Sequence, residues 1–200
     1  MESVDRFYRS YSKYLEYYDN DSLFMLFNSL HSLNDRLKSE YDLNLFEIEE
    51  FIVLKAIRNY IHHQGEMLNK LTSSTITKIQ PIQTDLMFMC LIMKPDLEKA
   101  INEIPNKFRD EHKKVIENHV HFYGSVVNIG HVIFNMAAKL MVFLDKNSIE
   151  GKSDEYTKNF NCMVFDIENG HSITVSGRLY THINNTTGKI EDILLRAIQT

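Results

Sequence analysis

Apolar residues recur at helical spacing along the first third of the chain and predict three helices there. The first, over residues 4–18, has a tyrosine-rich face, and the second follows the capping sequence Asn-Asp-Ser at 20–22. The third runs from about residue 44 to residue 63. It is acidic at its start and basic at its end, with Gly65 placed as a C′ glycine. The second helix has one continuous apolar stripe, formed by Leu23, Leu26, Phe27, Leu30, Leu33 and Leu37.

The centre of the chain is less regular. Residues 69–83 show no period and predict a connector, whereas the short apolar run at 85–93 fits a strand and a helix equally well. Residues 106–144 return to a helical and increasingly apolar pattern. Because one helix of that length would be unusual, we expect a break near Gly124.

The last quarter of the chain predicts some β-structure. Residues 147–159 are polar and predict an exposed loop, and β-favouring residues flank Asn169-Gly170, a strong signal for a hairpin. A third β-favouring run at 178–183 could extend this hairpin into a meander, and a last helix is expected over 190–198.

Taken along its length, the pattern predicts a mainly α fold. We expect a helical bundle with a small C-terminal antiparallel β-hairpin or meander. Residues 1–148 would form the helical domain, and residues 149–200 a small β-containing extension packed on it.

The composition is that of a globular chain, with 44% hydrophobic and 24% charged residues. Only seven glycines and three prolines are present, which argues against disorder and against a turn-rich β-sandwich. The net charge of −5 gives no support to broad, sequence-independent binding of polyanions. A local cleft can nevertheless carry the opposite sign to the whole molecule, so RNA binding at a small site is not excluded.

Other features of the chain predict a cytoplasmic protein without a membrane partner. The longest apolar stretch, residues 126–144, is interrupted by Asn128, His131, Asn135 and Lys139. Since a lysine alone costs about 2.5–3.5 kcal/mol at a bilayer centre, this stretch predicts a buried core helix. The N-terminus lacks a secretory signal pattern, and Cys90 and Cys162 lie in apolar runs that suit buried free thiols.

The strongest candidate chemistry lies in the sequence "LKAIRNYIHHQG" at residues 54–65. In the simpler interpretation, Arg58, His62 and His63 are cations in the last turn of a helix. Each would stabilise the negative end of that helix by about 0.3–1 kcal/mol. Gly65 fits this interpretation, which requires no catalysis.

The same segment resembles the motif of the HEPN superfamily. That motif is an apolar helix followed by Arg, often Asn, and then a histidine, with four to six residues between the arginine and the histidine. Arg58, Asn59 and His63 occupy those places here, and the resemblance covers mainly residues 21–65.

The resemblance implies a small all-helical domain that acts as a metal-independent endoribonuclease, of the toxin or anti-phage defence type. It implies RNA as the substrate, no cofactor and no metal, and a homodimer in which two copies of the motif form one cleft. An antitoxin or a defence-system protein would be a further partner. Because members without activity exist, the alternative is a non-catalytic helical module that binds or regulates a protein partner.

The residue types suit RNA cleavage without a metal. A histidine that titrates near neutrality can take the proton from a ribose 2′-OH, which then attacks the adjacent phosphorus. A guanidinium supplies permanent planar donors for the negative charge of the transition state. We therefore expect His63 as the base, Arg58 as the oxyanion donor and Asn59 as a positioning residue. The products would be a 2′,3′-cyclic phosphate and a 5′-OH.

Helical geometry leaves the identity of the working histidine open. Residues five apart diverge by about 140°, whereas residues four apart lie about 40° apart. Arg58 would thus align with His62, and Asn59 with His63. Either the helix distorts at its end, or a partner subunit completes the site, or His62 is the working histidine. Tyr60, inside the motif, is an additional candidate.

A polar line on the apolar stretch gives one more candidate. Asn128, His131 and Asn135 follow one another at near-helical spacing. We expect a hydrogen-bonded stripe; the alternative is that His131 and its neighbours lie directly behind Arg58 and His63.

A metal site could be built from His112, His119 and His121. However, His119 and His121 are two residues apart on a predicted helix and would point in different directions, and no carboxylate pattern completes a ligand set. We therefore expect no metal site.

Overall fold

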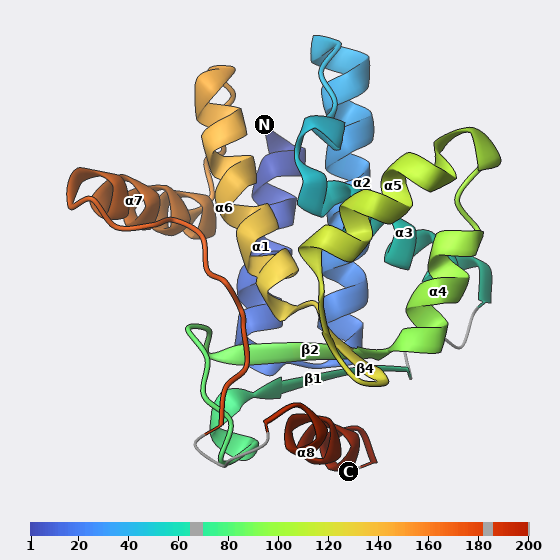
Figure 1. The fold of residues 1–200 in the computed structure, drawn as a ribbon. Helices are drawn as coiled ribbons and strands as arrows, with labels where there is room; N and C mark the ends of the chain where they lie inside the picture. The colour runs from blue at the N-terminus through green and yellow to red at the C-terminus, as the bar shows by residue number, and fades with distance from the viewer. Residues whose placement is uncertain (65–69, 182–185, 200) are drawn as a thin grey trace.

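The structure is a computed structural model that describes residues 1–64, 70–181 and 186–199 (Figure 1). It is mainly helical, which confirms the predicted fold class at that level. The helices are α1 Glu2–Tyr17, α2 Asn20–Tyr41, α3 Glu49–Gln64, α4 Lys94–Asn102, α5 Asn106–His119, α6 Gly130–Lys146, α7 Asp154–Glu168 and α8 Thr186–Gln199. Two further helical elements are the 3-10 turns η1 Leu45–Glu47 and η3 Ile76–Lys78.

Local capping defines the turn between α1 and α2. Tyr18 ends α1 in the left-handed conformation, at φ 52°, with its N–H donating to the Tyr14 carbonyl. The Asp19 carboxylate accepts a 2.7 Å hydrogen bond from the backbone N–H of Ser22 and so caps α2. The predicted cap therefore lies one residue earlier than expected. The tyrosine-rich face of α1 is buried in the core.

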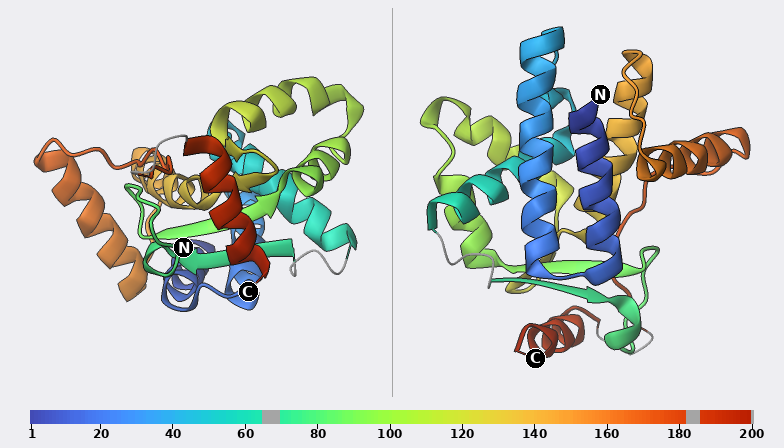
Figure 2. Two further views of the ribbon diagram at one scale, coloured as in Figure 1. Left: turned by 60° about the horizontal axis from the view of Figure 1, so that its bottom comes forward. Right: turned by 180° about the vertical axis from the view of Figure 1, so that it is seen from behind.

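A small antiparallel sheet occupies the middle of the chain. Its strands are β1 Leu71–Thr75, β2 Phe88–Met93, β3 His121–Tyr123 and β4 Val126–Asn128, in the order β1-β2-β4-β3. The helices α1, α2 and α6 stand over one face of this sheet, and α8 lies across the opposite face (Figures 1 and 2).

Strand β2 is buried on both faces, which explains why its apolar run shows no alternation. Phe88, Cys90 and Ile92 belong to the core beneath the helices. Met89 and Leu91 point the other way, into a smaller core that includes residues of α8. A strand covered on both sides reads as a continuous apolar segment, so period alone could not distinguish it from a helix.

The predicted C-terminal β-hairpin is wrong. Residues expected to form its first strand belong to α7, and Asn169 and Gly170 end that helix instead of joining two strands. Tyr156, Phe160 and Met163 recur at helical spacing and pack on the main core, so tertiary contacts override the local β-preference. The predicted loop at 147–159 is likewise cut short, because α7 begins at Asp154.

The segment after α7 is extended but forms little sheet. In the described part of the tail, its pairing is a single antiparallel bridge between Gln83 and Tyr180. The described residues of 149–200 thus contain two helices and no strand, and the domain boundary at residue 148 stays a prediction.

The predicted break near Gly124 is confirmed. The turn between β3 and β4 contains Gly124 at φ +63° and separates α5 from α6. Gly65, the predicted helix stop, lies outside the described residues. Cys90 is buried as expected, but Cys162 is exposed on α7, which corrects the prediction of two buried thiols. Within the described ranges no helix has the length and apolarity needed to cross a membrane.

Candidate functional site

The motif residues lie on the last turns of α3, a helix that packs against α2, α4, α5 and α6. Arg58 is half-buried and reaches toward α2. Its Nε donates to Asn28 Oδ1 at 3.2 Å, and its Nη1 donates to Asn59 Oδ1 at 3.4 Å. Two asparagine side chains therefore hold the guanidinium in place. Because both are neutral acceptors, they leave its charge uncompensated by these contacts.

The two motif histidines are exposed at the end of α3. Their ring centroids lie 5.9 Å apart, with an angle of 37° between the ring planes. Both rings are open to solvent and reachable by a substrate. Tyr60, in contrast, is only 4% exposed and belongs to the core, so the structure separates it from the exposed residues of the motif.

Arg58 does not meet a motif histidine within one copy of the chain. In the described part, its hydrogen bonds go to the two asparagines and not to His62 or His63. The helix is regular over these residues, so the expected divergence of Arg58 and His63 applies. The distortion that was one of three alternatives is absent from the described end of α3. Two alternatives remain: a partner subunit completes the site, or His62 is the working histidine.

A third histidine, missed by the sequence analysis, lies beside Arg58. His31 of α2 is half-exposed and lines a small depression together with Arg58 and Lys55. Its Nδ1 is 3.2 Å from Asp35 Oδ2. Burial lowers the pKa of His31, and the nearby cations lower it further, while Asp35 opposes them. The lowered pKa favours a neutral imidazole near pH 7, the form that can accept a proton.

The residues around the arginine follow a simple spacing. Asn28, His31 and Asp35 are three and four residues apart, so they share one face of α2 beside its apolar stripe. This spacing was readable in the sequence. Nothing in the sequence said that this face turns toward Arg58, because that depends on how α2 packs on α3.

His131 lies at the opposite end of α3. Its Nε2 donates to the His119 carbonyl at 2.8 Å, and its ring stacks on His121 with centroids 4.5 Å apart. His119 Nε2 is in turn 3.1 Å from Glu49 Oε2, in the first turn of α3. Since Glu49 and His63 are 14 residues apart on one helix, about 21 Å separate them along its axis. His131 therefore does not lie behind Arg58 at the C-terminal end of the helix.

The predicted polar line is a hydrogen-bonded stripe, as expected, but Asn128 lies at the end of β4, and His131 and Asn135 lie on α6. Asn135 Nδ2 donates to the Val175 carbonyl at 3.0 Å, and the Val175 N–H donates back to Asn135 Oδ1 at 2.9 Å. Asn128 Oδ1 accepts from the Gly130 N–H at 3.0 Å. These side chains hold the extended tail segment and the start of α6, which is a structural role.

The histidines considered for a metal are dispersed. His112 stacks against Phe108 and Phe46 on the side of α5 that faces α3, whereas His119 pairs with Glu49 and His121 bonds to the Ser176 carbonyl. Among the described residues, no group of three or more His, Cys, Asp or Glu side chains is placed to hold a metal ion.

A cavity of about 440 Å³ adjoins the motif through Asn59. It lies between α3 and the α4–α5 pair, and Asn59 is one of its lining residues. Asn59 thus connects the cavity with Arg58, to which it is hydrogen-bonded. A volume of this size is typical of small-molecule and cofactor sites. This cavity could not be identified from the sequence, because its walls come from three separate helices and η1.

Comparison of the chain with protein-family models, with curated proteins and with solved structures found no match. The resemblance to the HEPN superfamily therefore rests on the motif residues of the sequence.

Proposed function

We propose that this chain is a metal-independent endoribonuclease of the HEPN type, acting as a toxin or an anti-phage defence effector. One observation carries the proposal. The guanidinium of Arg58 is fixed by Asn28 and Asn59 at the end of a helix where His62 and His63 are exposed. An arginine and accessible imidazoles are the groups that 2′-OH attack needs when no metal takes part.

The roles follow from the chemistry of each group. His63 removes the proton from the ribose 2′-OH, and the resulting oxygen attacks the adjacent phosphorus. The P–O5′ bond breaks, and the leaving 5′ oxygen takes up a proton from the protonated histidine or from water. Arg58 donates hydrogen bonds to the non-bridging oxygens, which gain negative charge in the transition state. Asn59 positions the arginine. His62 and His31 are the competing candidates for the base, because His62 follows Arg58 by one helical turn and His31 lines the same depression.

A homodimer would bring the separated groups together. Arg58 of one copy points toward α2, whereas His63 points away into solvent. Two copies of α3 that meet at their exposed ends would place a histidine of one subunit opposite the arginine of the other. In this proposal the active site lies across the interface, and an antitoxin or defence-system protein controls access to it.

Cleavage of mixed-sequence RNA by the purified protein in excess EDTA tests this proposal. We expect the wild type to cleave, leaving 2′,3′-cyclic phosphate and 5′-OH ends. Arg58→Ala should lower the rate by about 10²–10³-fold, as for loss of one transition-state donor. His62→Ala, His63→Ala and His31→Ala, measured together, identify the base as the variant that loses about 10²-fold or more. Cleavage that needs a divalent metal, or that Arg58→Ala leaves unchanged, would contradict the proposal.

A further inference from the structure

We propose that the cavity between α3 and the α4–α5 pair binds one unpaired nucleobase of the RNA substrate, next to the cleavage site. This inference rests on the proposed function and adds a base-recognition site to it. The cavity has the size of a small-molecule site, about 440 Å³, and it adjoins Arg58 through Asn59.

The cavity offers flat aromatic surfaces. The rings of Phe108 and His112 lie nearly parallel, at an interplanar angle of 10° and with centroids 5.6 Å apart. Phe46 continues this row, 6.1 Å from His112. Phe46 and Phe108 are 38% and 42% exposed, so part of each ring is open to a ligand. The Nζ atoms of Lys55 and Lys107 lie 4.5 Å from the centroids of the Phe46 and Phe108 rings, respectively. Aromatic rings of this kind stack on bases, and each stacked base contributes about 1–3 kcal/mol.

The interior of the cavity is apolar, with a few polar groups at defined places. Ile52, Ala56 and Ala100 contribute apolar lining. Asn59 supplies both a hydrogen-bond donor and an acceptor, and Glu111 supplies carboxylate acceptors. Because a carboxylate accepts hydrogen bonds but does not donate them, it favours a base that carries an exocyclic amino group over uracil.

Positive charge lies between the cavity and the motif. Lys55 lines both the cavity and the small depression at Arg58, and its Nζ stands 4.5 Å from the centroid of the Phe46 ring. Lys55 precedes Asn59 by one helical turn, so the two side chains share one face of α3. A nucleotide with its base in the cavity would therefore direct its phosphate toward Lys55 and Arg58. An apolar side chain of a protein partner would use the rings but would not use this charge.

Binding of short oligoribonucleotides tests the inference separately from cleavage. The probes are 2′-fluoro octamers, which lack the attacking hydroxyl, each with 2-aminopurine at a different position. Stacking quenches the fluorescence of 2-aminopurine. The Arg58→Ala variant is included so that binding is measured in a protein without the proposed oxyanion donor.

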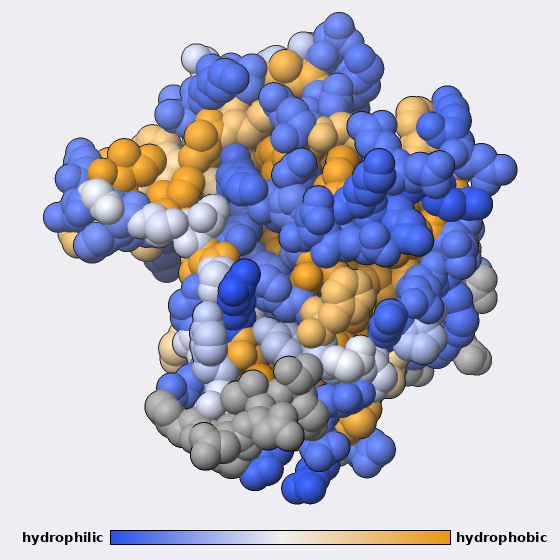
Figure 3. Space-filling view, in the orientation of Figure 1, coloured by the Kyte–Doolittle hydropathy of each residue, from blue (hydrophilic) through white to orange (hydrophobic). Residues whose placement is uncertain are grey.

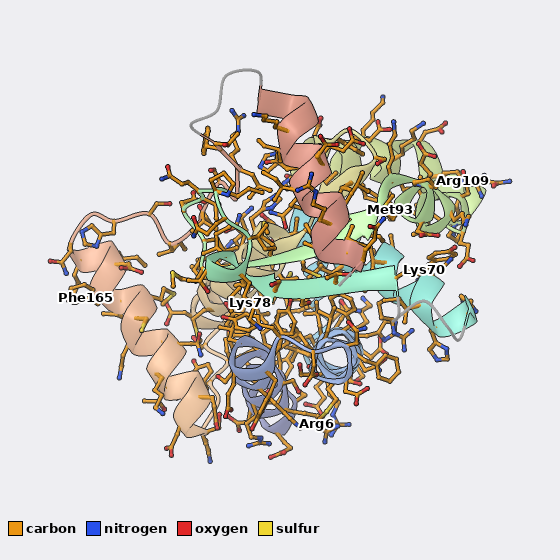
Figure 4. All side chains as sticks on the ribbon, turned by 90° about the horizontal axis from the view of Figure 1, so that it is seen from below. Arg6, Lys70, Lys78, Met93, Arg109 and Phe165 are labelled. Atoms are coloured by element: carbon orange, nitrogen blue, oxygen red, sulfur yellow. The ribbon has the colours of Figure 1, made fainter. Side chains whose placement is uncertain are left out.

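We expect quenching at one position of the octamer for the wild type. Arg58→Ala should show quenching at the same position but bind more weakly, because it lacks one of the two cations that face the phosphate. Phe108→Ala should weaken this binding by about 5- to 150-fold, the range that corresponds to one stacked base. Phe165→Ala is the matched control, because Phe165 is an exposed phenylalanine on α7, on the opposite side of the molecule from Arg109 of α5 (Figure 4). It should bind like the wild type.

The outcomes separate the two proposals. Quenching that Phe108→Ala abolishes supports the cavity site even if the wild type cleaves no RNA, in which case only the catalytic proposal fails. Cleavage without quenching, or equal binding by Phe108→Ala and Phe165→Ala, overturns the cavity site and leaves the ribonuclease proposal standing. If 2-aminopurine riboside 5′-monophosphate binds as tightly as the octamer, the ligand is a free nucleotide and the RNA assignment is overturned.

Discussion

The two ends of α3 differ in how their histidines are used. Near the N-terminal end, His131 is 5% exposed and donates to a backbone carbonyl. His121 donates to the Ser176 carbonyl at 2.7 Å, and His119 pairs with Glu49. At the C-terminal end, His62 and His63 are exposed. The same residue type thus fastens chain segments at one end and faces solvent at the other.

This contrast indicates that the hydrogen-bond partners of a histidine, more than the residue type itself, decide whether its ring has a structural role or is free to meet a substrate. A ring nitrogen that already donates to a carbonyl inside the core is committed to the fold. An exposed ring can approach a substrate and exchange protons with water.

The surface seen in Figure 3 is largely hydrophilic, with an apolar area over α7 that does not belong to either end of α3.

Mixing two inactive variants would sharpen the comparison most strongly, because it tests whether the exposed end is completed by a second copy. Arg58→Ala and His63→Ala subunits are combined by co-refolding, and their RNA cleavage is compared with that of each variant alone. Each loss should cost about 10²-fold or more, so a mixed dimer with one intact composite site should exceed either variant by about tenfold or more. No gain on mixing, with dimers present, would rule out a site shared between subunits.

The structural role of His131, near the N-terminal end of α3, should appear in how the stability of the protein depends on pH. Burial lowers the pKa of His131 to about 4, below the value of about 6.5 expected in the unfolded chain. As the pH falls from about 6.5 toward 4, the unfolded chain gains a proton that folded His131 does not bind, so stability falls. The loss attributable to this group approaches about 3 kcal/mol near pH 4.

Urea unfolding between pH 7 and pH 4.5 measures this effect in the wild type and in His131→Gln. Glutamine keeps a donor for the His119 carbonyl but does not titrate, so its stability should fall less steeply over this range. Glu50 and Asp85 also face His131 and act in the opposite direction, and both remain in the variant. Parallel pH curves for the two proteins would contradict the assignment.

A smaller loss of stability is expected when the ion pair between α3 and α6 is broken. Lys139 Nζ lies 2.6 Å from Glu50 Oε1, and the Glu50 side chain is 3% exposed whereas that of Lys139 is 39% exposed. Lys139→Met would leave a buried carboxylate without its cation. Because Lys139 is partly in water, we expect a loss of about 2 kcal/mol, below the range for a fully buried pair. Thermal and urea unfolding measure it.

The double variant Glu50→Gln with Lys139→Met is the control for that measurement. Removing both charges should recover part of the lost stability, since no unpaired charge stays buried. RNA cleavage per folded molecule should be unchanged in both variants, because this pair lies near the N-terminal end of α3. A loss of cleavage without a loss of stability would break the distinction between the two ends.

Much of the helical fold could be predicted from the sequence, because α1, α2 and α3 each carry a local apolar period. The sheet could not. Strand β1 is mostly polar, β2 is apolar on both faces, and β3 and β4 have three residues each, so none shows the alternation of a half-buried strand. The β-favouring residues of α7 led to the wrong prediction of a hairpin, because the contacts that stabilise this helix are made with elements distant in sequence.

The candidate site was predictable only where it is local in sequence. Arg58, Asn59 and the two histidines lie on adjacent turns of one helix, and their exposure could be anticipated from a helix end. Asn28 and His31 join them through the packing of α2, which no local pattern reports. For His131 the sequence left two alternatives open, because a polar line on an apolar helix does not reveal which neighbour it faces.

The most direct test of the central distinction measures cleavage and stability together for one substitution at each end of α3. Arg58→Ala and His131→Gln are compared with the wild type at neutral pH, in EDTA, for RNA cleavage per folded molecule and for urea unfolding. We expect Arg58→Ala to lose about 10²–10³-fold in cleavage with nearly unchanged stability. We expect His131→Gln to keep full cleavage and to change only stability and its pH dependence. Cleavage retained by Arg58→Ala, or lost by folded His131→Gln, would contradict it.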